Sequence, residues 1–315
     1  MSDFKRGQRA KQPNHIPLRG WWDIAKRIIK QMSRDNLSLV AAGVAFYALL
    51  AIFPAIAALV SVYAYFASPN DISAYLSQFM ALLPQSTQEI ILSQVSSLAQ
   101  KSQTSLSLSA LGTLLLTIWS SSKGSQALIT ACNISYQEYE KRSFFKAQLV
   151  RLLFSVGAIV VAVIALVIIG ILPLALNLLG IKESIDFLIM LISWPLLALT
   201  FNFALLILYR YAPHRKAAKW RWVTVGSFTA TVLWIVASFG FSFYVSHFAS
   251  YNETYGSLGG VVIMLMWLFI SAYIIILGAT INAALEQQTA QDSTVGPDKK
   301  RGQRGAYVAD HLDTK

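Results

Sequence analysis

Six long apolar segments, separated by shorter polar ones, dominate the pattern of the chain. They lie at about 37–66, 106–133, 152–179, 187–209, 222–246 and 258–285. Each is close to or longer than the roughly 20 residues that a helix needs to cross about 30 Å of hydrocarbon. Backbone amides in lipid must find partners inside their own segment, so these segments are expected to be helices. The pattern predicts an all-α, multi-pass membrane protein with six transmembrane helices.

The polar segment 1–36 carries a helical pattern of its own. Apolar side chains recur there at helical spacing, at Trp21, Ile24, Ala25, Ile28, Ile29 and Met32. Four basic residues lie mostly on the opposite side, namely Lys26, Arg27, Lys30 and Arg34. This arrangement predicts an interfacial amphipathic helix whose cations contact anionic lipid head groups. The alternative is a basic stop signal beside the first span.

Two further segments complete the organisation. In the first long connection, 67–105, apolar residues at helical spacing end at Pro84, and Ser86 with Glu89 has the spacing of a capping box. We expect two short amphipathic helices there, across the outer mouth of the bundle. The polar residues after 286 predict a tail without fixed structure. The chain is thus divided into segment 1–36, a membrane domain over 37–286 and a polar tail over 287–315.

Composition supports a membrane protein. Hydrophobic residues make up 55% of the 315 residues and charged residues only 13%, with a mean hydropathy of +0.53. A soluble domain carries roughly 25% charged residues, so a soluble globular chain and a disordered one are both excluded. Cys132 is the only cysteine, which excludes an intrachain disulfide.

The distribution of basic residues predicts an orientation. The N-terminal segment, the second and fourth connections and the C-terminal tail together hold 23 Lys and Arg, whereas the other connections hold two. The positive-inside rule then places both termini in the cytoplasm. The asymmetry accounts for the net charge of +11 without a nucleic-acid partner. Membrane lipids with anionic head groups are the expected partners, and assembly into a homo-oligomer is left open.

Lys123 is the most informative charge, because it lies inside the second apolar segment. It is surrounded by Ser120, Ser121, Ser122 and Ser125. A lysine at the bilayer centre costs about 2.5–3.5 kcal/mol on insertion scales, so it needs a partner, water or an interface. One interpretation is a polar cavity in which Lys123, Ser121 and Ser122 bind an anion. The other is a lysine that reaches the membrane interface with its long side chain.

A second candidate for anion contact opens the last apolar segment. Tyr255, Gly256 and Ser257 precede a helix whose positive dipole end could meet an anion. Gly256 and Gly260 also have the GxxxG spacing that permits close helix packing. A tight turn followed by packing is therefore the alternative.

Motifs for catalysis are missing. The four histidines are scattered, and no metal-binding, Walker or GxSxG pattern occurs. The sequence predicts no enzyme, no cofactor and no metal.

The chain resembles the YihY/BrkB family of bacterial inner-membrane proteins over most of residues 20–286. The resemblance rests on four stretches, namely 41–54, 119–133, 209–213 and 255–259 followed by 277–282. It implies a multi-pass protein of the bacterial inner membrane. Members have been labelled ribonuclease BN and serum-resistance factor, and the residues give the ribonuclease label no support. Where the family usually has a glutamate in its last motif, this chain has Thr280.

Two functions from different classes follow from these observations. The first is transport or translocation of an anionic lipid or solute, with Lys123 as a contact. The second is a non-transporting membrane scaffold or envelope-integrity factor that holds partners with its basic face and tail. A water-accessible Lys123 would favour the first.

Overall fold

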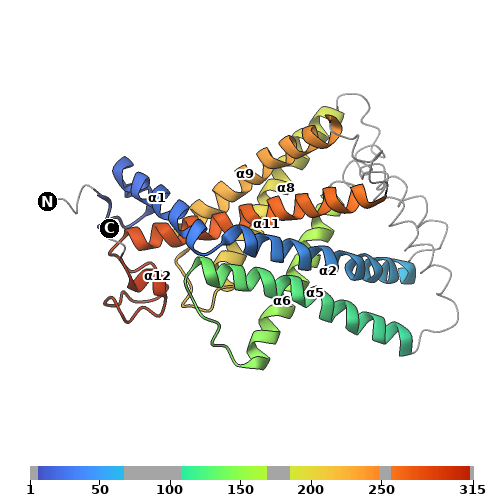
Figure 1. Cartoon of the computed structure of the whole chain (residues 1–315), viewed down its shortest axis with the longest axis horizontal. Coiled ribbons are helices and arrows are strands. Elements are labelled where there is room, and N and C mark those ends of the chain that lie inside the picture. The colour runs from blue at the N-terminus through green and yellow to red at the C-terminus, as the bar shows by residue number, and fades with distance from the viewer. Residues whose placement is uncertain (1–5, 67–107, 169–184, 248–256, 313–315) are drawn as a thin grey trace.

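The computed structural model describes residues 6–66, 108–168, 185–247 and 257–312 (Figure 1). These ranges contain helices and one isolated β-bridge, between Ala218 and Thr294, but no strand. The helices are η2 (Pro13–His15), α1 (Leu18–Arg34), α2 (Leu37–Phe66), α5 (Leu108–Ser135), α6 (Phe144–Leu166), α8 (Ile185–Tyr211), α9 (Trp220–His247), α11 (Ser257–Gln288) and α12 (Tyr307–Asp310). The all-α prediction is confirmed.

Each of the six apolar segments corresponds to a long helix, and five agree with the expected bounds within three residues. The exception is α6, which begins at Phe144 rather than at 152. Lys146 and Arg151 lower the hydropathy of its first turns, but the apolar face continues through them with Phe145 and Leu149. The predicted end of this span, and the two short helices predicted within 67–105, lie outside the described residues.

Four of these helices are long and apolar enough to cross a membrane. The qualifying stretches are Phe144–Ala165, Ile192–Tyr211, Trp220–Val245 and Gly259–Gln288. A fifth is obtained if α1 and the described part of α2, which meet at a bend of 64°, form one broken span. The described residues therefore support four or five spans, and the count of six stays a prediction.

Helix α11 is central to the bundle, with α9 on one side and α2 on the other (Figure 1). It crosses α9 closely because both helices carry glycine at the crossing. A Cβ at Gly226 would clash with the carbonyl oxygen of Gly278, and one at Gly278 would clash with the Tyr209 hydroxyl. Asn282 fixes the crossing, since its Oδ1 accepts from the Gly226 amide at 2.7 Å and its Nδ2 donates to the Val223 carbonyl at 3.1 Å. Small residues at helix contacts are typical of membrane bundles.

The helix predicted before the first span is confirmed as α1, and one of its faces packs on the protein. Ile24 is buried against Trp222 and Leu285, at the start of α9 and the end of α11. Arg27, expected among the residues that contact lipid, is also buried here, and its Nη1 donates to the Ala284 carbonyl at 2.9 Å.

The prediction of a structureless C-terminal tail is wrong for residues 289–312. Val308 and Ala309 of α12 are buried in the protein core. The Arg304 guanidinium donates to the carbonyls of Ala290 (2.7 Å), Gln291 (3.1 Å) and Ala309 (2.7 Å). Composition suggested disorder because the segment is polar, but its polar groups are used to cap turns and neighbouring carbonyls.

Candidate functional site

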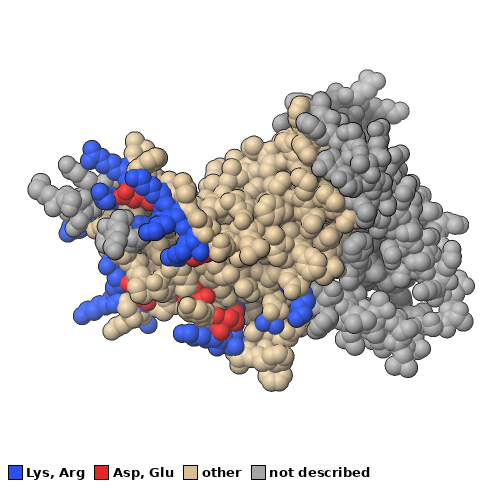
Figure 2. All heavy atoms as spheres, viewed as in Figure 1, with Lys and Arg blue, Asp and Glu red and all other residues tan. Residues whose placement is uncertain are grey.

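Lysine and arginine side chains gather around the end of the bundle that carries both termini (Figure 2). We call this the basic end. It comprises the residues before α2, the α5–α6 and α8–α9 connections, and the residues after α11. Two sites stand out in the described chain, a buried ion pair within the basic end and a polar contact between α5 and α6.

The buried ion pair joins Arg215, in the α8–α9 connection, to Glu286, near the end of α11. Arg215 Nη1 and Nη2 lie 3.0 and 2.6 Å from Glu286 Oε1 and Oε2, a bidentate arrangement. The two side chains are 1% and 0% exposed. Because a charge without its partner is costly in such a place, this pair fixes the connection against α11.

Two neighbours complete the pair. The Ser293 hydroxyl donates to Glu286 Oε2 at 2.5 Å, so the C-terminal segment is attached to the same carboxylate. The Arg215 guanidinium stacks over the Tyr136 ring, 4.9 Å from its centroid. Burial alone would lower the pKa of Arg215, but the Glu286 carboxylate outweighs burial and raises it above its ordinary value. Arg215 is therefore a permanent cation.

Other polar side chains tie the connections of the basic end to helix ends. Arg142 donates to the carbonyls of Ala212 (3.1 Å) and Pro213 (3.0 Å), which follow α8. Asn133 Oδ1 accepts from the His214 amide at 2.7 Å. Thr280 is buried and donates to the Ile276 carbonyl at 2.9 Å, with the Ser135 hydroxyl at 3.3 Å. These contacts have a structural role, because each one is a hydrogen bond to a backbone or side-chain group of the protein itself.

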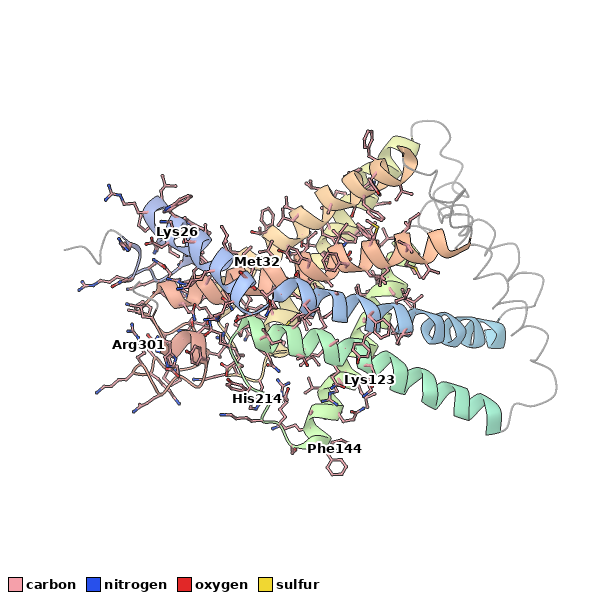
Figure 3. All side chains as sticks on the ribbon, in the orientation of Figure 1. Lys26, Met32, Lys123, Phe144, His214 and Arg301 are labelled. Carbon is pink, nitrogen blue, oxygen red and sulfur yellow. The ribbon has the colours of Figure 1, made fainter. Side chains whose placement is uncertain are left out.

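The second site lies where α5 meets α6, and it includes Lys123 (Figure 3). The hydroxyls of Ser125 on α5 and Ser155 on α6 are 2.9 Å apart. Lys123 lies two residues before Ser125, and Arg151 lies four residues before Ser155. Both cations are partly buried, and Ser122 is buried. Arg151, one turn before Ser155, therefore lies on the side of α6 that meets α5, and Lys123 belongs to the same turn of α5 as Ser125.

The remaining predicted site residues are only partly described. Ser121 belongs to α5 and Ser257 begins α11, but their side chains lie outside the described part of the chain, as do Tyr255 and Gly256 entirely. Whether the start of α11 approaches Lys123 stays a prediction. Lys26, Lys30 and Arg34 are exposed on α1, whereas Arg27 is buried against α11.

Sequence reasoning missed the Arg215–Glu286 pair. Arg215 is one of 26 basic residues in the sequence, and nothing near it in the sequence marks it as a partner of Glu286. A signal was present, because Glu286 is the only acidic residue in the 32 residues of α11. Within the described residues, no group of three His, Cys, Asp or Glu side chains is placed to hold a metal ion.

Comparison with known proteins gives one family. The sequence profile of the family "Virulence factor BrkB" matches residues 28–303. A ribonuclease-like protein, YfkH, of Bacillus subtilis is 33% identical over 181 residues, which are 56% of this chain and 65% of YfkH. Proteins named "UPF0761 membrane protein" from Tolumonas auensis and Aliivibrio salmonicida are 36% identical over 81 and 95 residues.

These matches cover part of each relative. The matched segments are 26% of this chain and of the Tolumonas protein, and 30% of this chain and of the Aliivibrio protein. The chain therefore matches under two thirds of YfkH and under a third of the two membrane proteins. No solved structure matches the chain.

Proposed function

From the premise that the chain belongs to the BrkB family of membrane proteins, we propose that it binds and translocates an anionic lipid or an anionic solute. The binding site we propose is the α5–α6 contact, with Lys123 and Arg151 as its cations. The observation that carries this proposal is the 2.9 Å contact between Ser125 and Ser155, which brings the turn of α5 that contains Lys123 against the part of α6 that contains Arg151.

The balance of charge within the helices supports an anionic ligand. The six long helices contain two carboxylates, Asp186 near the start of α8 and Glu286 near the end of α11. Glu286 is engaged by Arg215 and Ser293 at the basic end. Helices α5 and α6 contain no carboxylate, so the charge that these two helices contribute at their contact is positive.

The position of Lys123 supports a role inside the bundle over reach to the interface. Twelve residues separate Lys123 from Ser135, the end of α5 in the basic end. At 1.5 Å per residue this is about 18 Å along the helix, farther than a lysine side chain extends. Intramembrane cations are costly and by default mark functional sites.

The donor set fits a phosphate or carboxylate group. An ammonium and a guanidinium both donate hydrogen bonds, and Arg can bind two oxygens at once. The Ser155 hydroxyl donates to the Arg151 carbonyl at 3.0 Å, so the two serines join the helices and the cations are left as the donors to an anion. Basic atoms are visible within the mainly uncharged surface of the bundle, apart from the basic end (Figure 2). A head group could reach such a site sideways from the bilayer, and a solute could reach it through water.

Translocation is tested in vesicles that contain the purified protein and a fluorescent anionic lipid, with dithionite added to bleach the outer leaflet. Wild type should expose the inner-leaflet lipid to bleaching, Lys123→Glu should abolish that exposure, and Lys123→Arg should keep part of it. Lys146→Glu makes the same charge change at an exposed position of α6 and should behave as wild type. Radiolabelled glycerol phosphate inside the vesicles tests the solute arm. If Lys123→Glu matches wild type in both arms, the proposal fails.

A second candidate is a membrane scaffold, favoured by the folded C-terminal segment. Arg304 ties the two ends of this segment together through the Ala290 and Ala309 carbonyls, and Lys299, Lys300 and Arg301 are exposed on it. In this case Lys123→Glu would retain full rescue of a deletion strain. Replacement of the three exposed cations by Gln would abolish rescue without lowering the amount of folded protein.

We also propose that the basic end faces the cytoplasm of a bacterial inner membrane. The support is the excess of Lys and Arg around the end that carries both termini (Figure 2). Reporter fusions after residues 143 and 290 should report the cytoplasm, and fusions after residues 100 and 252 the periplasm. An inverted result at two of these sites would overturn this orientation.

A further inference from the structure

Helix α1 has a second apolar face that the protein does not cover. Leu18, Trp22 and Ile29 are 88%, 64% and 70% exposed. They are spaced by four and seven residues, which places them on one stripe of the helix. The stripe lies on nearly the opposite side of the helix from Ile24, Arg27 and Gln31, which are buried against the bundle.

Basic side chains border one edge of the exposed stripe. Lys26 Nζ lies 5.3 Å from the centroid of the Trp22 ring, so the cation and the aromatic ring form one surface. Arg19 and Lys30 are also exposed, and helical spacing places them next to Lys26. Around α1 the exposed apolar stripe is therefore followed by the basic face, and the basic face by the residues buried against the protein.

The protein holds α1 in this orientation. Arg27 donates to the Ala284 carbonyl at 2.9 Å, and Gln31 Nε2 donates to the Ser135 carbonyl at 2.8 Å. The segment before α1 is also attached, since Thr289 Oγ1 donates to the Ala10 carbonyl at 2.6 Å. The exposed stripe thus belongs to a helix fixed to α5 and α11.

We propose that α1 lies in the surface of the bilayer, with Leu18, Trp22 and Ile29 among the acyl chains and Lys26 and Lys30 at anionic head groups. Arg27 is not part of this surface, because its guanidinium is used within the protein. The arrangement matches an interfacial helix, in which an apolar stripe is buried and adjacent cations meet lipid phosphates. Tryptophan with a nearby cation suits the head-group region.

A bilayer suits this face better than a protein partner. Three side chains on one helix form a patch much smaller than the roughly 800 Å² per partner of a stable protein interface. The stripe is also continuous with membrane-embedded helix, since α1 meets α2 at a 64° bend and Leu39 at the start of α2 is 74% exposed.

The test measures the depth of labels on the full-length protein in lipid nanodiscs. Cys132 is buried and is replaced by Ala, and Trp22→Cys, Ile29→Cys and Lys30→Cys each receive a nitroxide label. In discs that contain phosphatidylglycerol, labels at 22 and 29 should be several-fold less accessible to a water-soluble relaxation agent than the label at 30. They should also be more accessible to oxygen.

The role of charge is tested in the same discs. Lys26→Gln in the Ile29→Cys protein should raise exposure of that label to the water-soluble agent, and phosphatidylcholine discs should have the same effect. Arg27→Gln should leave the response to lipid charge unchanged while destabilising the fold. If labels at 22 and 29 are as accessible to the water-soluble agent as the label at 30, the proposal is overturned. Equal depth in both lipids would overturn the role of Lys26.

Discussion

Replacing Glu286 by Gln tests whether the buried ion pair stabilises the basic end. The pair has two hydrogen bonds, at 3.0 and 2.6 Å, and both side chains are at most 1% exposed. The glutamine side chain would keep one acceptor but would leave Arg215 as a buried cation. Removal of one partner from a buried pair costs about 3–5 kcal/mol, and we expect a loss in unfolding free energy near 3 kcal/mol because Tyr136 still faces the guanidinium.

The measurement is equilibrium unfolding in mixed micelles, with SDS as denaturant and tryptophan fluorescence as the signal. Asp298→Asn is the matched control, since it removes the same kind of charge from the Lys219–Asp298 pair, whose aspartate is 72% exposed. An exposed pair is worth at most about 1 kcal/mol. In the double variant Arg215→Met/Glu286→Gln the uncompensated charge is gone, so stability should partly return.

Two outcomes would refute this reasoning. The first is that Glu286→Gln lowers the unfolding free energy no more than Asp298→Asn does. The second is that the double variant loses as much unfolding free energy as Arg215→Met and Glu286→Gln lose when their separate losses are added. Either result would mean that the pair does not determine how the α8–α9 connection is held on α11.

Three further predictions concern the packing of the bundle and the C-terminal segment. Gly226→Ala should destabilise the protein by more than about 2 kcal/mol in the same unfolding assay, because the new Cβ would clash with the backbone at the α9–α11 crossing. A Cβ at Gly240 meets nothing within 4 Å, so Gly240→Ala should be neutral or stabilising by up to about 1 kcal/mol. Arg304→Gln should speed amide hydrogen exchange over residues 289–312, since several carbonyls lose their donor, while Arg301→Gln, at an exposed position, should not. Burial alone would raise the pKa of Asp292, but hydrogen bonds from the Lys299 and Thr294 amides, together with Arg304, outweigh it and lower the pKa below its ordinary value. The ionised carboxylate therefore stabilises the segment above the unfolded pKa of about 3.9, and this stabilisation is lost as the pH falls through the lower folded pKa. Acid should accordingly speed amide hydrogen exchange of residues 289–312 in wild type, and less so in Asp292→Asn.

The bounds of the long helices were predictable because apolar runs of about 20 residues have few alternatives. The start of α6 was not, since Lys146 and Arg151 interrupt the hydropathy although they do not interrupt the helix. The amphipathic character of α1 was also predictable, but its pattern does not tell which apolar residues meet protein and which remain uncovered. Ile24 belongs to the first group and Ile29 to the second, and only the position of α11 separates them.

The candidate site was predictable to the level of Lys123 and no further. A lysine among serines within an apolar segment is visible in the sequence, whereas the approach of Arg151's part of α6 to α5 appears only in the contact between Ser125 and Ser155. The same is true of Arg215 and Glu286, which are 71 residues apart. The fold of the C-terminal segment depends on such pairings too, because Arg304 binds carbonyls that precede it by more than ten residues. Contacts of this kind leave no local pattern.

The central claim is that Lys123 creates a positive, water-accessible site for anions at the α5–α6 contact. It is tested most directly by the rates at which negatively and positively charged thiol reagents modify Gln126→Cys, one helical turn from Lys123, in a Cys132→Ala background. We predict that the rate of modification by the negatively charged reagent, divided by the rate for the positively charged one, exceeds the same ratio for a free thiol several-fold. Lys123→Gln should lower this rate ratio toward the free-thiol value. An anionic lipid should slow both reactions. Val160→Cys, on the exposed apolar surface of α6, should react with neither reagent. A ratio equal to that of the free thiol and unchanged by Lys123→Gln, or no reaction at position 126, would contradict the claim.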